Sequence, residues 1–288
     1  ALSIIRKHGA EMVEITTDKN GLDVDELETT LSQMRADGQI MPKLLFVVPD
    51  FHNPSGVTLP AERRRRLVEL AEEYDFVIFE DDPYRRLRYS GEPVPPIKAF
   101  DTCGRVVSSG TVSKVFGPGL RVGWANGDPD IIGRMAAYKS DGGSCPITQR
   151  IVLEAMQSGL IEQHIEELKP VMSQHLDAMC AAIDRHIPGV SYDRSDGGYY
   201  LWMELPEGVN ADQAVFDAED EGVLVFSGSM FYASPSERQN LRLCFTYSTP
   251  EQIEEGIRRL GAAIQRQLDS SEQSTTAVSG RTLREHFD

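Results

Sequence analysis

The stretch LLFVVPDFHNPSG, residues 44–56, passes from an unbroken apolar run into a polar loop that contains two prolines and a glycine. A short continuous apolar run is typical of a strand that is buried on both faces, as in a parallel sheet. The pattern recurs at FVIF (76–79), which EDDPY (80–84) follows, and at RVVS (105–108), which SGTVSK (109–114) follows. We therefore predict three strands that each end in a group of polar residues.

Helical patterns separate these strands, which predicts an α/β fold with a mostly parallel sheet flanked by helices. One helix is expected to begin at Thr58 or Pro60 and to end near Tyr74, and VGWA (122–125) is a fourth candidate strand. In the second half, a long helix and several short alternating segments predict a smaller α+β domain. The expected division is a large domain over 1–160, a long helix and small domain over 161–268, and a flexible tail over 269–288.

Composition and charge exclude several classes of protein. With 29 Lys and Arg against 45 Asp and Glu, the net charge of −16 argues against nucleic acid or an anionic membrane as the main partner. No apolar run reaches membrane-spanning length, and no signal peptide opens the chain. The four scattered cysteines indicate reduced thiols in a cytoplasmic protein and neither a disulfide framework nor a metal site. RRRR (63–66), among many glutamates, is interpreted as the solvated side of a helix.

The polar residues after the strands suggest one ligand. Carboxyl ends of parallel strands meet at one edge of a sheet, where ligands bind. A lysine there can form a Schiff base with an aldehyde, and an acid can pair with a protonated ring nitrogen. Tyrosine and asparagine can hydrogen-bond a phenolic oxygen, while hydroxyls and an arginine can hold a phosphate. Together these groups describe pyridoxal phosphate.

Four motifs carry a family resemblance, and they occur in the family's order: HNPSG (52–56), DDPY (81–84), SGTVSKVFGPGLRVGW (109–124) and NLRLCF (240–245). The chain resembles the fold-type I, class I/II aminotransferases up to about Leu268. Within the family it is most similar to the aminoadipate and kynurenine aminotransferases and to the related domains of MocR-type regulators. The family has a substantial segment before the point where this chain begins, so the large domain is expected to be incomplete here.

The resemblance implies roles around the cofactor ring. Lys114 would bind the cofactor aldehyde and later shuttle the α-proton as a general base. Asp81 would pair with the pyridinium nitrogen, and it is preferred over Asp82 because it stands three residues before Tyr84. Tyr84 and Asn53 would hydrogen-bond the 3-oxygen of the ring.

The resemblance also implies a phosphate site and a substrate site. Thr111 and Arg121, with Ser113, would bind the phosphate, and Arg242 would bind the α-carboxylate of the substrate through a bidentate pair. His52 has no assigned role. The aromatic residues Tyr199, Tyr200 and Trp202, which follow a glycine pair, are interpreted as core residues.

The implied activity is transfer of the amino group of an L-α-amino acid to a 2-oxo acid, such as 2-oxoglutarate, by a ping-pong mechanism in a homodimer. Other pyridoxal phosphate reactions are compatible with the same motifs. One alternative is a sensing domain of a MocR-type regulator that binds the cofactor without turnover. Another is a truncated homologue with impaired activity.

Overall fold

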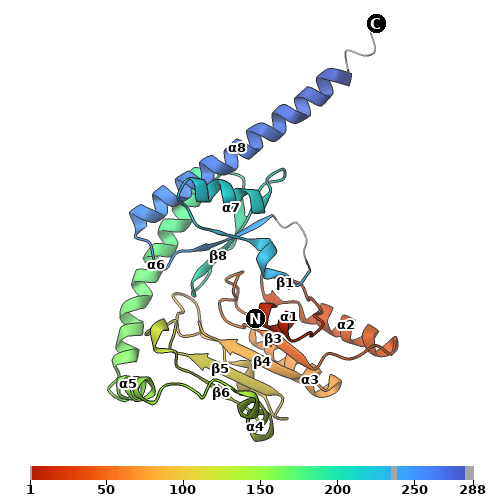
Figure 1. Cartoon of the computed structure of the whole chain (residues 1–288), viewed down its shortest axis with the longest axis vertical. Coiled ribbons are helices and arrows are strands. Elements are labelled where there is room, and N and C mark those ends of the chain that lie inside the picture. Colours follow the sequence, from red (N-terminus) through yellow and green to blue (C-terminus); the bar gives the residue numbers. More distant parts are fainter. Residues whose placement is uncertain (1, 235–238, 283–288) are drawn as a thin grey trace. The chain divides into compact units, whose positions relative to one another are not determined.

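The computed structural model describes residues 2–234 and 239–282. The chain forms two compact units. The large unit comprises Ile15–Val171 and Ser195–Tyr199, and the small unit comprises Ala1–Glu14, Met172–Arg194 and Tyr200–Asp288. Each unit has its own four-stranded sheet (Figure 1).

The sheet of the large unit confirms the predicted α/β class. Its strands lie in the order β3-β4-β5-β6. β3 and β4 are parallel, β4 and β5 are parallel, and β6 is antiparallel to β5. The bounds are β3 (Leu44–Val47), β4 (Val77–Asp82), β5 (Val106–Thr111) and β6 (Gly123–Asn126).

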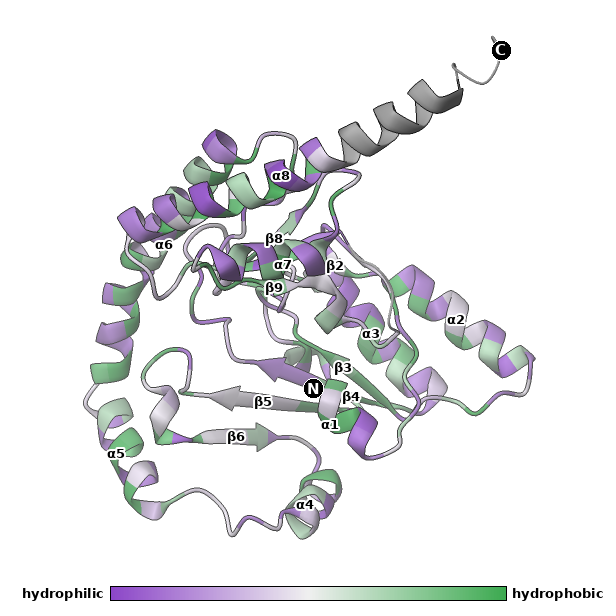
Figure 2. Cartoon of the chain, turned by 45° about the horizontal axis from the view of Figure 1, so that its top comes forward, coloured by the Kyte–Doolittle hydropathy of each residue, from purple (hydrophilic) through white to green (hydrophobic). Residues whose placement is uncertain are grey.

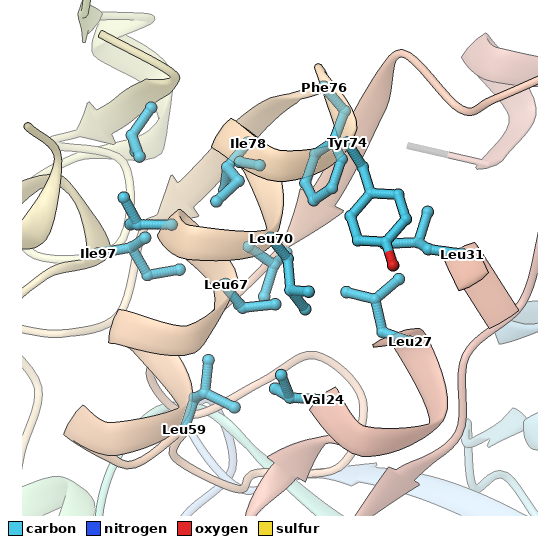
Figure 3. Packing of buried hydrophobic residues seen from close by; sticks show 14 residues of the cluster. Val24, Leu27, Leu31, Leu59, Leu67, Leu70, Tyr74, Phe76, Ile78 and Ile97 are labelled. Carbon is cyan, nitrogen blue, oxygen red and sulfur yellow. The ribbon is translucent and has the colours of Figure 1, made fainter. Parts of the chain in front are cut away.

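Two helices cover one face of this sheet and form its main core (Figure 3). α2 (Val24–Ala36) is capped by Asp23, whose carboxylate accepts the N–H groups of the first turn. α3 (Ala61–Tyr74) fills the position predicted for a helix after the first strand. Each fully buried aliphatic side chain contributes about 1.5–3 kcal/mol. The fully buried members of the core include Leu31, Leu67, Leu70, Ile78, Ile97 and Val106.

The prediction that the first strand is buried on both faces is wrong. Leu44 and Phe46 are 53% and 36% exposed, whereas Val47 is buried and Leu45 packs against the core. Successive side chains of a strand point to opposite faces. α2 and α3 cover one face, so only every second residue of the run is packed beneath them.

The pairing of β5 with β6 forms a hairpin, and both Lys114 and Arg121 lie on its loop. Glycine is required at the point where the two strands approach. A Cβ at Gly110 would lie 2.5 Å from the Trp124 ring, and a Cβ at Gly123 would lie 2.9 Å from the carbonyl oxygen of Gly110. These close contacts explain why glycine occupies positions 110 and 123, on either side of the loop that carries Lys114 and Arg121.

Short elements and a second core complete the large unit. Buried residues of this second core include Leu87, Val112, Val115, Val152 and Ile161. Val112 and Val115 lie beside Lys114 in the sequence, so this core anchors the hairpin loop. The remaining elements are β1 (Thr17–Asp18), β2 (Gly21–Leu22), η1 (Ile97–Phe100), η2 (Pro118–Leu120), α4 (Pro129–Tyr138), α5 (Pro146–Gln157) and the start of α6 (Leu160–His186).

The small unit is an α+β structure, as predicted. Its sheet has the order β7-β8-β10-β9 and is antiparallel throughout. Alternate residues of the two central strands are buried, among them Leu201, Met203, Leu241 and Leu243. Its elements are α1 (Leu2–Lys7), the end of α6, β7 (Ser191–Tyr192), β8 (Tyr200–Glu204), α7 (Ala211–Asp220), β9 (Phe226–Ser227), η3 (Gly228–Phe231), β10 (Asn240–Cys244) and α8 (Pro250–Thr282).

Two boundaries differ from the predicted ones. The chain passes from the large to the small unit at Met172, within α6, whereas the prediction divided the domains after residue 160. α8 continues to Thr282, beyond the expected end near Leu268. Proline would interrupt the backbone hydrogen bonds of a helix, and none follows Pro250 within α8. Polar side chains alone do not interrupt them. Residues 283–288 of the predicted tail lie outside the described residues.

Polar and apolar residues alternate along the two long helices, α6 and α8, as Figure 2 shows. Within residues 2–234 and 239–282, no helix combines the length and the apolar character needed to cross a membrane.

Candidate active site

The loop after β3 carries Asn53 and is folded tightly on itself. The N–H of Gly56 donates to the carbonyl oxygen of His52 at 2.6 Å, and the N–H of His52 donates to that of Val57 at 2.9 Å. Gly56 has a φ of +74°, a conformation that glycine adopts without strain. Phe51 is buried at the base of the loop. The loop is thus a fixed turn, which places Asn53 at the carboxyl end of β3.

A buried ion pair holds this loop against α3. The guanidinium of Arg64 donates to the carboxylate of Asp50 at 3.0 Å, and the two side chains are 0% and 1% exposed. Arg64 also donates to three carbonyl oxygens, those of Pro49, Leu59 and Pro95, at 2.8–3.1 Å. A second arginine, Arg88, approaches Asp50 at 3.5 Å.

The interpretation of RRRR as a solvated face is therefore wrong for Arg64. In α3, Arg64 lies on the same helical face as Leu67, Val68 and Ala71, all of which are buried. Arg66 behaves as expected, because it pairs with Glu28 and Glu69 at the surface. A run of four identical residues gives no sign of which member faces the core, and the packing of α3 in the folded unit shows that it is Arg64.

Two adjacent carboxylates at the end of β4 occupy different environments. Asp81 accepts a hydrogen bond from the hydroxyl of Ser109 at 3.1 Å, its partner in the register of β5. Asp82 forms an ion pair with Arg85 at 3.0 Å and also accepts that residue's backbone N–H. Burial raises the pKa of both carboxyls, and that of Asp82 to about 6. Since neighbouring side chains of a strand point to opposite faces, only one of the two can serve a given site.

The raised pKa of Asp82 predicts a pH dependence of stability. The folded state holds a proton on Asp82 up to about pH 6, whereas the unfolded chain releases it near pH 4. This carboxyl therefore lowers the free energy of unfolding as the pH rises from 4 to 6, by on the order of 2 kcal/mol. We expect Asp82→Asn to remove this decrease. Urea unfolding at several pH values tests it, and a slope equal to that of the unchanged protein would contradict it.

The loop between β5 and β6 carries hydroxyls, an amine and a guanidinium. Thr111 Oγ1 lies 2.9 Å from Ser113 Oγ and accepts the backbone N–H of Ser113 at 3.1 Å. The carbonyl oxygen of Val112 accepts the N–H groups of residues 115, 116 and 117, which turns the chain around Lys114. Arg121 has a φ of +53° and donates to the carbonyl oxygen of Pro118 at 3.2 Å. The hydroxyls of Thr111 and Ser113, which are predicted to bind the phosphate, therefore lie side by side. The guanidinium of Arg121 instead binds a carbonyl oxygen of the turn that precedes it.

Tyrosine rings adjoin Lys114 and Tyr84. Lys114 Nζ lies 5.3 Å from the centroid of the Tyr199 ring, and the Tyr199 hydroxyl donates to the carbonyl oxygen of Lys114 at 2.7 Å. The rings of Tyr199 and the buried Tyr84 have centroids 5.7 Å apart. From the sequence, Tyr199 was interpreted as a core residue in a stretch that lies near the substrate side in relatives, and it does pack against the second core. The sequence did not predict its contact with Lys114, 85 positions away.

His52, to which the sequence assigned no role, lies in the loop beside Asn53. Its Nδ1 is 2.8 Å from the hydroxyl of Ser55. Burial lowers the pKa of His52 to about 4, so its ring is neutral at physiological pH. It can hydrogen-bond within the turn but brings no positive charge to it.

Arg242 belongs to the small unit and lies in β10 opposite Trp202. Three aromatic rings surround its guanidinium, with centroids at 4.2–4.9 Å: Tyr200, Phe226 and Phe231. Aromatic faces attract a guanidinium and hold its plane in a fixed orientation. Arg242 is thus a stacked cation and not a freely solvated side chain.

The large unit contains seven of the eight predicted site residues. These residues lie at the ends of β4 and β5 or in the segments that follow β3, β4 and β5, and they are Asn53, Asp81, Tyr84, Thr111, Ser113, Lys114 and Arg121. The eighth, Arg242, is in the small unit. An amide follows β3, a carboxylate and a phenol follow one another at the end of β4, and hydroxyls and an amine follow one another at the end of β5. Polar groups at the carboxyl ends of neighbouring parallel strands are typical of a ligand site in an α/β fold.

Comparison with known proteins identifies the family. The profile for "Aminotransferase class I and II" matches residues 2–260, and the chain belongs to this family. It is 38% identical over 271 residues to "Aromatic-amino-acid aminotransferase 1" of Thermococcus litoralis, which covers 93% of this chain and 65% of the relative. It is 32% identical to "2-aminoadipate transaminase" of Thermus thermophilus, over 92% of this chain and 66% of that relative.

Solved structures show the same fold. A kynurenine aminotransferase of Pyrococcus horikoshii, crystallised in complex with PMP, superimposes with a TM-score of 0.89 at 37% identity, over 93% of this chain and 67% of that one. Relatives named as uncharacterized HTH-type transcriptional regulators also match, including one from Bacillus subtilis at 29% identity over 92% of this chain and 54% of the relative. The chain spans about two thirds of the length of the aminotransferases that it matches.

Proposed function

We propose that this chain binds pyridoxal phosphate and transfers the amino group of an L-α-amino acid to a 2-oxo acid. The observation that carries the proposal is the set of side chains at the ends of β3, β4 and β5, which together match each part of this cofactor. Membership of the class I and II aminotransferases supports the same conclusion.

The residues of the large unit fit the cofactor by their chemistry. Lys114 would hold the aldehyde carbon covalently through Nζ, and the ring nitrogen would face the carboxylate of Asp81. The Asp81–Ser109 hydrogen bond fixes that carboxylate on one face of β4. Tyr84 and Asn53 would hydrogen-bond the 3-oxygen.

The phosphate would be held by the loop between β5 and β6. Thr111 and Ser113 already present adjacent hydroxyls, at 2.9 Å from each other. Arg121 would supply the positive charge, and reaching a phosphate would require it to leave the carbonyl oxygen of Pro118. Charge-assisted hydrogen bonds of this kind are the strong ones in phosphate sites.

The division of chemical work follows from these positions. When bound, pyridoxal phosphate supplies an electron sink that makes the α-hydrogen of the amino acid acidic. Lys114 Nζ would take up that proton and deliver it to the aldehyde-derived carbon of the cofactor in the same half-reaction, and it would move a proton in the opposite direction in the second half-reaction. Asp81 would keep the proton on the ring nitrogen, and Arg242 would bind the α-carboxylate through two parallel hydrogen bonds. The second substrate, a 2-oxo acid such as 2-oxoglutarate, would bind through the same arginine in a ping-pong cycle.

A direct test uses the purified protein with added pyridoxal phosphate. We expect a visible absorption band, and borohydride reduction should remove this band and leave the cofactor permanently attached to one lysine. Addition of L-amino acids one at a time is then expected to bleach the band and to release a 2-oxo acid. If the protein develops no band, the proposal is wrong.

The same experiment addresses the alternative of a cofactor-binding sensor, which the match to HTH-type regulators favours. A sensor would bind an amino acid with a lasting change in the absorption band and without release of a 2-oxo acid. The aminotransferase assignment is preferred because two relatives named as an aminotransferase and a transaminase are 38% and 32% identical to this chain, against 29% for the regulator.

Replacement of the two adjacent carboxylates tests the role of Asp81. We expect Asp81→Asn to lower kcat by about 10²–10³-fold, because a neutral amide does not stabilise a protonated ring nitrogen. Asp82→Asn, the matched control, should lower kcat by less than about tenfold, since Asp82 is paired with Arg85. Steady-state kinetics of the two holoproteins decide the matter. A larger loss in Asp82→Asn would reverse the assignment.

The resemblance to the family also leads us to propose a homodimer in the cytoplasm. The net charge of −16 supports the view that this chain does not itself bind nucleic acid. Sedimentation of the holoprotein would measure the oligomeric state.

A further inference from the structure

The segment Ser195–Tyr199 comes from the second half of the chain but belongs to the large unit. It first contacts the loop that carries Asn53. The hydroxyl of Ser195, which is 5% exposed, donates to the carbonyl oxygen of Gly56 at 2.8 Å. Gly198 packs so closely on Phe51 that a Cβ there would lie 2.5 Å from the Cβ of Phe51. The segment is therefore fitted to this loop.

The same segment contacts the chain that follows Tyr84. The N–H of Gly198 donates to the carbonyl oxygen of Leu87 at 2.9 Å, and a Cβ on Gly197 would lie 2.3 Å from that oxygen. The backbone N–H of Tyr89 donates to the carbonyl oxygen of Asp196 at 2.7 Å, and the Tyr89 hydroxyl donates to that of Gly198. Only glycine allows the two backbones to approach this closely.

The third contact is with Lys114, through Tyr199. The Tyr199 hydroxyl donates to the main-chain carbonyl of Lys114 at 2.7 Å, and its ring lies 5.3 Å from the Lys114 amine. One five-residue segment thus contacts the three loops that carry Asn53, Tyr84 and Lys114. None of these contacts is accounted for by the proposed chemistry.

We propose that Tyr199 is a positioning residue for Lys114, with its hydroxyl fixing the main chain and its ring fixing the amine. The face of an aromatic ring attracts a positively charged nitrogen within about 6 Å. Tyr199 therefore stabilises the charged form of the nitrogen at Nζ and restrains where it lies. The proposal extends the proposed function, in which this nitrogen holds the cofactor.

The cofactor-free protein provides a test that does not depend on the proposed function. Acetic anhydride reacts with neutral amines, and mass spectrometry measures its reaction at Lys114 relative to the exposed Lys139. Tyr199→Met removes the ring that restrains the Lys114 amine and should raise this ratio at pH 8 about threefold. Tyr199→Phe keeps the ring and should leave the ratio within about 1.5-fold of its original value.

The holoprotein provides a second readout. Loss of the Tyr199 hydroxyl removes one hydrogen bond, so both variants should raise the dissociation constant of pyridoxal phosphate about fivefold. Only Tyr199→Met should also move the pH midpoint of the visible band, to lower pH by about half a unit. If the unchanged protein shows no visible band, the proposed function is wrong. The labelling of the cofactor-free protein would still decide the role of Tyr199.

Tyr89→Met is the matched control, because Tyr89 and Tyr199 pack against the same core and the Tyr89 hydroxyl donates to the carbonyl oxygen of Gly198, whereas that of Tyr199 donates to the carbonyl oxygen of Lys114. It should leave the labelling ratio and the pH midpoint unchanged. Equal ratios in Tyr199→Met and the unchanged protein would overturn the proposal. An increase in Tyr89→Met as large as that in Tyr199→Met would overturn it as well, because it would reflect a general loosening of the core.

Discussion

Lys114→Ala is expected to abolish the visible band of the bound cofactor and to lower kcat by about 10⁴-fold. The proposed site has one amine at the end of β5, and that amine has two tasks, covalent binding of the cofactor and transfer of the α-proton. General base catalysis alone contributes about 10²–10⁴-fold. The loss should appear in kcat much more than in KM, because Arg242 and the loop hydroxyls would still bind their ligands.

Lys139→Ala is the control for this variant, since Lys139 is half exposed and pairs with Asp141 at the surface of the large unit. It should retain the band and the activity. A small primary amine such as methylamine should restore part of the activity of Lys114→Ala, because it can replace the missing base. If Lys114→Ala still shows the band, and borohydride attaches the cofactor permanently to this variant, another lysine holds the cofactor.

Arg64→Met is expected to lower the free energy of unfolding of the large unit by about 3–5 kcal/mol. The substitution leaves the carboxylate of Asp50 buried without its main partner, and removal of one member of a buried pair has a cost of this size. It also leaves the carbonyl oxygens of Pro49, Leu59 and Pro95 without the donor that they share. Since Asp50 stands three residues before Asn53, the cofactor should bind more weakly as well.

Arg66→Met makes the same change on the same helix at the surface. Arg66 is about one-third exposed, so the loss of its pairs with Glu28 and Glu69 should cost less than about 1 kcal/mol. Guanidinium unfolding can be followed by Trp124 fluorescence in a Trp202→Phe background, because Trp124 belongs to the large unit and Trp202 to the small one. Similar losses in the two variants would show that Arg64 contributes no more than a surface pair.

Local patterns were sufficient to predict the parallel part of the sheet and the position of most proposed site residues after its strands. The apolar runs that begin at residues 44, 76 and 105 became β3, β4 and β5, which lie side by side and parallel in the order of the sequence. The helix predicted between the first two runs is α3. The carboxyl ends of parallel strands lie at one edge by geometry alone. For this reason, residues that are far apart in the sequence but each follow a strand could be predicted to share a site.

Other features could not be predicted from local patterns. The apolar run of β3 predicted burial on both faces, whereas the helices cover only one of them. The antiparallel pairing of β6 places the Trp124 ring against Gly110, a close approach that composition does not reveal. α8 extends beyond the last residues that show a helical pattern of apolar side chains. Polar residues are compatible with a helix, but they give no periodic pattern from which it could be predicted.

By itself, the sequence determined the class of fold and the family, because both depend on residue type and on the order of short motifs. The tertiary structure alone decided which arginine of RRRR is buried, which of the two adjacent aspartates faces Ser109, and that Tyr199 lies against Lys114. These outcomes depend on the direction of a side chain and on contacts between segments 14 to 85 residues apart. Packing of the whole unit determines both.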